Sequence, residues 1–250
     1  MNYTEALAAL ALPGDSLVDK RVPKKLLLEQ GAPTPGDKRA IQDGIEELAW
    51  IAALKPTNIG VPIYRDVTRE YLEIAVLTGT FRQAAKATRL IELVHRAIPY
   101  PVVLLSSHEG SLTMSLAHKR FSQSQSGAVV VEGEIATALL TPRTKFKETF
   151  LARITLASQP PETLFSIYQG WIDQIETLAA AHITDRYAPA TDAEAAAARR
   201  AALASHARNH DELISLRAQA AKEKQMKRRV ELNLEIRRLE IGIGKLSEEL

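Results

Sequence analysis

The chain has 250 residues, of which 46% are hydrophobic and 25% are charged, and its formal net charge is +2. These proportions are those of an ordinary folded protein, and so small a charge does not by itself indicate a nucleic-acid-binding surface. The absence of cysteine excludes disulfides and thiolate metal sites. No apolar stretch is long enough to span a bilayer, so we expect a cytoplasmic protein with no membrane partner.

Two helices are expected in the first 56 residues. Residues 1–12 are apolar but contain Glu5 and lack a basic leader, which favours a short helix over a signal peptide. Asp37 should begin a second helix, which ends before Pro56 because the residue before a proline disfavours helix. Its buried side should be a stripe at helical spacing, formed by Ile41, Ile45, Leu48 and Ala52.

The next hundred or so residues alternate between strand and helix signals. The continuous apolar run at 102–105 predicts a buried central strand. His108-Glu109-Gly110 predicts a tight turn, and residues 122–127 predict a polar loop. The other expected elements are strands at 71–77, 111–117 and 129–131 and a helix at 81–98. Residues 1–157 are therefore predicted to form an α+β domain, a small mixed sheet with flanking helices.

The rest of the chain is expected to be a helical arm. Residues 158–190 should hold an amphipathic helix, from Glu162 to His182, and a connector. Residues 191–250 contain no proline, and Thr191 and Glu194 form a T-x-x-E capping box. This pattern predicts one long coiled-coil-like helix, about 90 Å in length if it is continuous.

The end of that helix carries a heptad seam. Apolar residues recur at alternating spacings of four and three, which is typical of a helix that packs along a partner helix. The seam consists of Leu232, Ile236, Leu239, Ile243, Leu246 and Leu250. Three heptads are marginal for an isolated coiled coil. The seam should therefore dock on another protein, on a second copy of the chain, or back onto the helix at 162–182.

Basic residues suggest a nucleic-acid contact. Lysine and arginine clusters can neutralise phosphates, although a solvated helix face, partly neutralised by a Glu223–Lys227 pair, would have the same composition. The candidate contact residues are Lys119, Arg120, Lys222, Lys224, Lys227, Arg228 and Arg229.

No catalytic constellation is complete. A nuclease with an E-x-K motif needs a lysine two residues after an acid, but alanine follows Glu73 and Glu134 at that position. His206 and His210 could share a metal on one helical face, yet no third ligand stands at a convincing spacing. We therefore expect no catalytic residue, no cofactor and no metal.

Several short motifs, taken in chain order, are similar to those of a known family. They are Val22-Pro23-Lys24-Lys25, Ala49-Trp50, Leu54-Lys55-Pro56, Glu73-Ile74, Ala97-Ile98-Pro99-Tyr100-Pro101, His118-Lys119-Arg120 and the run from Glu223 to Asn233. Over nearly its whole length the chain resembles the bacterial domain of unknown function 4391 family. Members are often encoded near DNA methyltransferases and helicases in phage-defence or restriction islands. The resemblance implies an accessory role beside such enzymes and supplies no catalytic residue.

These observations favour a non-catalytic accessory or assembly subunit of a phage-defence or restriction-type system. Its C-terminal helix would contact a helical segment of a methyltransferase or helicase subunit, or a second copy of itself. One alternative is a nucleic-acid-binding module, for DNA or RNA, that uses the basic band of the long helix. A second alternative is an atypical metal-dependent nuclease around Glu73.

Overall fold

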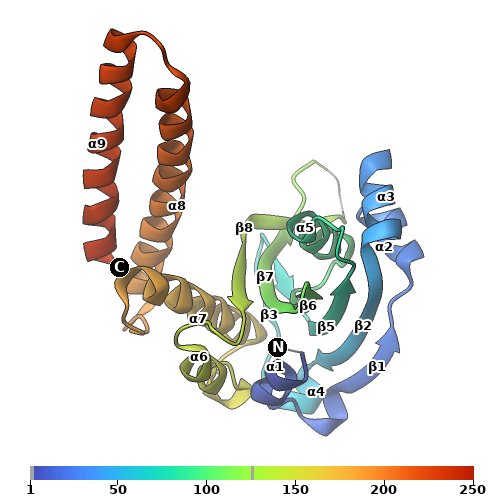
Figure 1. The fold of residues 1–250 in the computed structure, drawn as a ribbon. Coiled ribbons are helices and arrows are strands. Elements are labelled where there is room, and N and C mark those ends of the chain that lie inside the picture. Colours follow the sequence, from blue (N-terminus) through green and yellow to red (C-terminus); the bar gives the residue numbers. More distant parts are fainter. Residues whose placement is uncertain (1–2, 125–126) are drawn as a thin grey trace. The chain divides into compact units, whose positions relative to one another are not determined.

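The computed structural model describes residues 3–124 and 127–250, and the chain divides into two compact units, Met1–Ile175 and Glu176–Leu250 (Figure 1). The boundary falls inside helix α7 (Leu164–Thr184). The predicted segments 1–157, 158–190 and 191–250 stay a prediction, because compactness does not show which part folds independently. Of the predicted loop at 122–127, residues 125 and 126 lie outside the described residues.

The first unit is built on a mixed six-stranded sheet whose strands follow one another in chain order. Strands β5 and β6 are parallel and joined by helix α5 (Ala87–Ala97), and every other neighbouring pair is antiparallel. The strands are β1 (Leu17–Arg21), β2 (Ile45–Leu54), β5 (Ile74–Phe81), β6 (Val102–His108), β7 (Ser111–Phe121) and β8 (Val129–Leu140). A small hairpin of β3 (Tyr64–Arg65) and β4 (Glu70–Tyr71) stands apart from this sheet.

Helices surround the sheet, and α2 (Lys24–Gln30), α3 (Pro35–Gly44) and α5 share a hydrophobic core with one of its faces (Figure 1). Fully buried members of that core include Leu27, Ile41, Leu77, Leu93 and Leu104. The other short helical elements of this unit are α1 (Tyr3–Leu10), α4 (Pro56–Ile59), α6 (Lys147–Arg153) and the 3-10 turns η1 (Gly14–Ser16) and η2 (Leu156–Ser158). The predicted architecture, a mixed sheet with flanking helices and long C-terminal helices, is confirmed.

The predicted turn between β6 and β7 has the geometry of a tight hairpin. Glu109 and Gly110 both have positive φ, 49° and 75°, and they separate the paired residues His108 and Ser111. Two consecutive left-handed residues match the twist of antiparallel strands, which is why this two-residue loop is favoured.

The helix predicted from Asp37 to Ala52 is wrong beyond Gly44. Helix α3 ends there and the chain continues as β2, a central strand between β1 and β5. The register of β2 against β5 shifts between Ile45 and Glu47, which is a β-bulge. The extra residue lets Ile45 and Leu48 contact the same core although they are three positions apart. A bulged strand thus imitates helical spacing.

The second unit is a helical hairpin. Helices α8 (Ala193–Lys222) and α9 (Met226–Glu249) lie side by side and pack against each other (Figure 1). The single helix predicted over 191–250 is therefore wrong, because residues 223–225 interrupt it. Glu223 is the C-cap of α8. Its backbone N–H donates to the carbonyl oxygen of Gln219, and its ψ of 126° is outside the helical range. No proline or glycine marks this break, and folding back buries apolar stripes that one extended helix would expose.

The start of α8 also differs from the prediction. Asp192, and not Thr191, is the N-cap, because its carboxylate accepts the backbone N–H of Ala195 at 2.8 Å. Thr191 donates its hydroxyl to Asp192 instead. In the part of the chain that the structure describes, no helix is long and apolar enough to cross a membrane.

Candidate functional site

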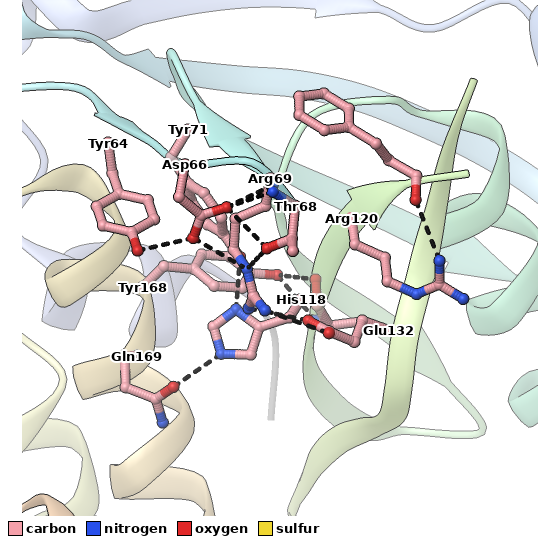
Figure 2. A network of polar contacts seen from close by, with 12 residues as sticks. Tyr64, Asp66, Thr68, Arg69, Tyr71, His118, Arg120, Glu132, Tyr168 and Gln169 are labelled. Atoms are coloured by element: carbon pink, nitrogen blue, oxygen red, sulfur yellow. Dashed lines mark hydrogen bonds and ion pairs between the residues drawn. The ribbon is translucent and has the colours of Figure 1, made fainter. Parts of the chain in front are cut away.

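A network of polar and aromatic side chains connects the β3–β4 hairpin with β7, β8 and α7 (Figure 2). It is built beside a bulge in β8: between the pairs Leu116–Ala136 and His118–Glu132, β7 advances by two residues and β8 by four. The bulge frees the backbone of Ala117, whose N–H bonds to the hydroxyl of Tyr168 at 2.8 Å. That hydroxyl also lies 2.8 Å from the carbonyl oxygen of Val102, to which it donates. Tyr168 thus connects α7 to β6 and β7.

His118 occupies the centre of the network with both ring nitrogens engaged. Nε2 lies 2.8 Å from Oε1 of Gln169, and Nδ1 lies 2.5 Å from the hydroxyl of Tyr71. Gln169 donates its amide N–H to Asp173, so its oxygen can only accept from His118. This pattern fits a neutral ring protonated at Nε2, with Tyr71 donating to Nδ1. Burial raises the pKa of Tyr71 well above its usual range, which keeps the hydroxyl protonated.

Arg69 links the hairpin to the sheet edge. Its guanidinium pairs with both carboxylate oxygens of Glu132, at 2.9 and 3.2 Å, and lies 5.6 Å from the centre of the Phe165 ring. Asp66 organises the loop before it by accepting from the hydroxyl and the backbone N–H of Thr68. These bonds, together with one from Tyr64, hold the pKa of the Asp66 carboxyl well below its usual range.

The network is closed. The His118 ring stacks on Phe165 at 5.1 Å, and neither of its nitrogens points to an open position. Among residues 3–124 and 127–250, no group of three or more His, Asp or Glu side chains could hold a metal ion. The network therefore supplies rigidity to the β3–β4 hairpin. Glu73, the centre of the nuclease alternative, pairs with Lys55 at 2.9 Å, which leaves that alternative without a supporting observation.

Sequence reasoning missed this network. Asp66-x-Thr68 carries a local turn signal, because aspartate readily accepts the N–H two residues ahead. The long-range partners Arg69–Glu132 and Tyr71–His118 have no sequence signal, since they meet only after the sheet forms.

Lys119, predicted to contact nucleic acid, is only 3% exposed and cannot serve as a surface cation. Its ammonium donates to the backbone carbonyl of His95, in the last turn of α5. Burial lowers the pKa of Lys119 to about 7. His95 is completely buried, bonds to the hydroxyl of Ser115 through Nε2, and has its pKa lowered by burial to about 3.

The heptad seam of α9 packs against another helix of the same chain, α8. Leu232 is buried, and the other five seam residues are partly buried. Helix α8 shows the same alternation of four and three in its own less exposed residues, which are Ala202, His206, Asn209, Leu213, Leu216 and Ala220. Arg217 of α8 pairs with Glu240 of α9 at 2.7 Å across the hairpin. The fold-back is thus onto α8 and not onto the helix predicted at 162–182.

The side of α9 that does not face α8 remains apolar in part. Met226, Val230, Leu234 and Ile241 are between 50% and 66% exposed. Their spacings of four, four and seven place them along one side of the helix. We call these four residues the outer face of α9.

The basic run Lys222–Arg229 surrounds the turn of the hairpin. Arg228 pairs with Glu231 at 3.0 Å, whereas the predicted Glu223–Lys227 pair is not formed and Glu223 accepts the N–H of Gln225. Within the described residues, Lys222, Lys224, Lys227 and Arg229 form no ion pair. The rings of His206 and His210 lie parallel, 6.4 Å apart, on α8.

An open groove of about 810 Å³ lies between α5 and β8 in the first unit. Its polar lining is of mixed charge, with Glu92, Arg96, Glu109 and Glu134. Glu92 pairs with Arg96 at 2.9 Å, so part of this charge is neutralised within the groove.

The fold defines a two-unit protein, with a mixed α/β unit and a helical hairpin. The model of the family described as Domain of unknown function (DUF4391) matches residues 10–242, and the chain belongs to this family. No curated protein and no solved structure matches it significantly.

Proposed function

We propose that this protein is a non-catalytic accessory subunit that assembles with a partner protein through the outer face of α9. The observation that carries the proposal is the exposure of Met226, Val230, Leu234 and Ile241 along one side of a helix whose other side is already packed. Exposed apolar patches bordered by polar residues are typical of protein-interaction sites. A partner helix would bury these side chains as knobs between its own residues.

The charges around the outer face favour an acidic partner. Lys227, Arg237, Arg238 and Lys245 lie on the exposed surface of α9 beside the four apolar residues. A second copy of α9 would bring the same cations into contact, which is unfavourable. We therefore propose an acidic amphipathic helix of a different protein as the partner, in a phage-defence or restriction-type system with a methyltransferase or helicase subunit.

Co-purification with a candidate methyltransferase or helicase subunit tests this proposal. Complex formation is measured by analytical ultracentrifugation for the wild-type chain, for Leu234→Glu and for Ile241→Glu. Both variants should lose the complex and keep the folded hairpin in circular dichroism. Leu17→Glu on β1, with similar exposure, is the control and should bind normally. Binding that survives both α9 variants would rule out the outer face as the contact.

Nucleic-acid binding at the hairpin turn is the second candidate, favoured by the unpaired cations Lys222, Lys224, Lys227 and Arg229. Because phosphate contacts release counterions, affinity should fall steeply with salt. Fluorescence anisotropy with labelled DNA and RNA at low and high salt measures this. Reversing Lys224, Lys227 and Arg229 to glutamate should abolish binding, whereas Lys25→Glu in α2 should not. Equal affinity of the triple variant and the wild type would exclude the turn.

A further inference from the structure

Strand β8 is one edge of the six-stranded sheet, and within the described residues no strand pairs with its outer side (Figure 1). Its two halves differ in regularity. Residues 133–135 form the bulge, where Gly133 has a φ of 68°. From Ala136 to Leu140 every residue pairs in register with β7. We call Ala136–Leu140 the free edge of β8, which is about 17 Å long at roughly 3.4 Å per residue.

The backbone groups of two residues in the free edge point away from β7. The two-residue turn after β6 closes on the pair His108–Ser111, which is hydrogen-bonded in this kind of hairpin. Counted along β7 from Ser111, the even-numbered residues bond to β8, and they pair with even-numbered residues there. The N–H and C=O groups of Thr137 and Leu139 therefore face outwards. The carbonyl oxygen of Leu139 accordingly accepts the hydroxyl of Thr144, which lies outside the sheet, at 3.3 Å.

The free edge lacks the features that usually protect sheet edges from pairing. It is regular and contains neither proline nor a charged residue. The opposite edge of the sheet, β1, has three consecutive charged residues at 19–21 and an irregular register. The side chains of Thr137 and Leu139 are exposed, that of Leu139 to 57%. An unprotected edge with an exposed leucine is typical of a site where another strand pairs.

The groove beside the free edge carries unpaired negative charge. Leu139 lines this groove together with Glu109 and Glu134. Within the described residues these two carboxylates form no ion pair, whereas Arg96, the one arginine in the lining, pairs with Glu92. An added strand would direct alternate side chains towards this groove. Basic and apolar side chains there would complement the carboxylates and the exposed leucine.

We propose that the free edge of β8 binds an extended basic segment of a different protein, which joins the sheet as an additional strand. An extended segment offers backbone partners to Thr137 and Leu139, whereas a helix uses its own backbone groups internally. Lysine or arginine side chains of the segment pair with Glu109 and Glu134, and apolar side chains between them cover Leu139. This interaction is independent of the one proposed for α9.

A second copy of the chain is a poor occupant of the free edge. Two β8 strands paired with each other would bring the two Glu134 carboxylates onto one surface, which is unfavourable. Strand β1 of a second copy is irregular, with Asp19 at a φ of 44°. Pairing of β8 with β1 would also leave a free edge on every added copy and form an open polymer.

The probe is the terminally blocked peptide Thr-Lys-Thr-Val-Thr-Lys-Thr, which spans the free edge and carries both lysines and the valine on one side of a strand. NMR titration of the full chain measures binding and the hydrogen exchange of single amides. The peptide should bind and slow exchange at Thr137 and Leu139, whereas Ala136 and Ala138 should be protected already in the free chain. Of two peptides N-methylated on the odd or on the even residues, only one should lose binding, because only alternate residues point to β8.

Charge reversal and a proline substitution place the contact. Glu134→Lys should weaken binding of the peptide by about threefold and strengthen binding of its counterpart with glutamate for lysine. The exposed Glu162→Lys is the control and should behave as wild type. Thr137→Pro removes an outward N–H, leaves the bonds to β7 in place and should abolish binding.

Three results would overturn the proposal. The first is no binding of the peptide to the folded wild-type chain. The second is binding without protection of Thr137 and Leu139, or equal binding of both N-methylated peptides. The third is self-association of the wild-type chain that Thr137→Pro abolishes in sedimentation, which would make a second copy the occupant. If circular dichroism shows that Thr137→Pro does not fold, Glu134→Lys with the two peptides of opposite charge still decides.

Discussion

The ammonium of Lys119 donates a hydrogen bond to the carbonyl oxygen of His95. That oxygen receives no backbone hydrogen bond from its own helix. In α5 that carbonyl would accept the N–H of the residue four positions later, but this residue is Pro99, which has none. A side chain from β7 therefore replaces a missing backbone donor at the end of the helix. The Pro99-Tyr100-Pro101 and His118-Lys119-Arg120 motifs, distant in sequence, are connected by this bond.

Lys119 should make stability depend on pH above neutrality. Its pKa is about 7 in the fold, against 10.5 for the model group, so between these values the unfolded chain binds one more proton. Stability should thus rise with pH across that window, by up to about 1.4 kcal/mol per pH unit. Urea unfolding at several pH values should show this rise in wild type and its loss in Lys119→Met. A rise that persists unchanged in the variant would show that another group causes it.

His95 should produce a second pH dependence on the acid side. Its pKa is about 3 in the fold against 6.5 for the model group, so the unfolded chain binds the extra proton between these values. Stability should therefore fall as the pH decreases from 6.5 towards 3, again by up to about 1.4 kcal/mol per pH unit. His95→Gln should have a shallower dependence in urea unfolding, and the exposed His182→Gln is its control. Identical slopes in the two variants would contradict this assignment.

The bond between Tyr71 and His118 should be measurable as a coupling. His118→Phe leaves the buried Tyr71 hydroxyl without its acceptor, which should cost about 1–3 kcal/mol of unfolding free energy. Adding Tyr71→Phe removes the unpaired hydroxyl, so the double variant should be more stable than the sum of the two single effects predicts. Additive effects in a double-mutant cycle would mean that the two groups do not interact.

Two leucines in α9, only two positions apart, should respond differently to truncation. Leu232 is 2% exposed and belongs to the seam, so Leu232→Ala should destabilise the hairpin by about 2 kcal/mol or more. Leu234 is 55% exposed, so Leu234→Ala should change stability by less than about 0.5 kcal/mol. Amide hydrogen exchange in α8 and α9 measures the change in the stability of the hairpin for each variant. Equal destabilisation by the two variants would contradict the conclusion that the seam, and not the outer face, is the packed side of α9.

Two glycines should respond in opposite directions to replacement by alanine. A Cβ at Gly31 would lie 2.6 Å from the Cβ of Ala97, so Gly31→Ala should destabilise the first unit by about 1–3 kcal/mol. Gly244 lies inside α9 with nothing within 4 Å, so Gly244→Ala should stabilise the helix by up to about 1 kcal/mol. Thermal unfolding of both variants tests the pair, and a stabilising Gly31→Ala would contradict the close packing of α2 on α5.

Sequence patterns predicted those parts of the fold that depend on short-range spacing. The apolar run at 102–105 is the buried strand β6, and the Glu109-Gly110 turn has the predicted position. Prediction was wrong where a long-range contact overrides local spacing. Because of the bulge in β2, Ile45 and Leu48 have the three-residue spacing that is typical of a helix. Only pairing with β1 and β5 makes the segment a strand.

The candidate sites were likewise predictable from the sequence only in part. The heptad spacing from Leu232 to Leu250 was visible in the sequence, and it does define the side of α9 that packs. The partner was not visible, because the break at 223–225 has no proline or glycine and arises from the burial gained when α9 folds onto α8. Lys119 likewise reads as a surface cation beside Arg120, and only its packing beneath α5 makes it a buried amine.

By itself the sequence determined the family, the mixed class of fold, and which residues carry apolar and basic character. The tertiary structure alone decided which of those residues stay exposed. Local spacing sets which side chains can share one side of a helix or strand, and this follows from backbone geometry. Burial depends on what the rest of the chain brings against that side, so Leu232 became part of a core while Leu234, two residues later, remained available to a partner.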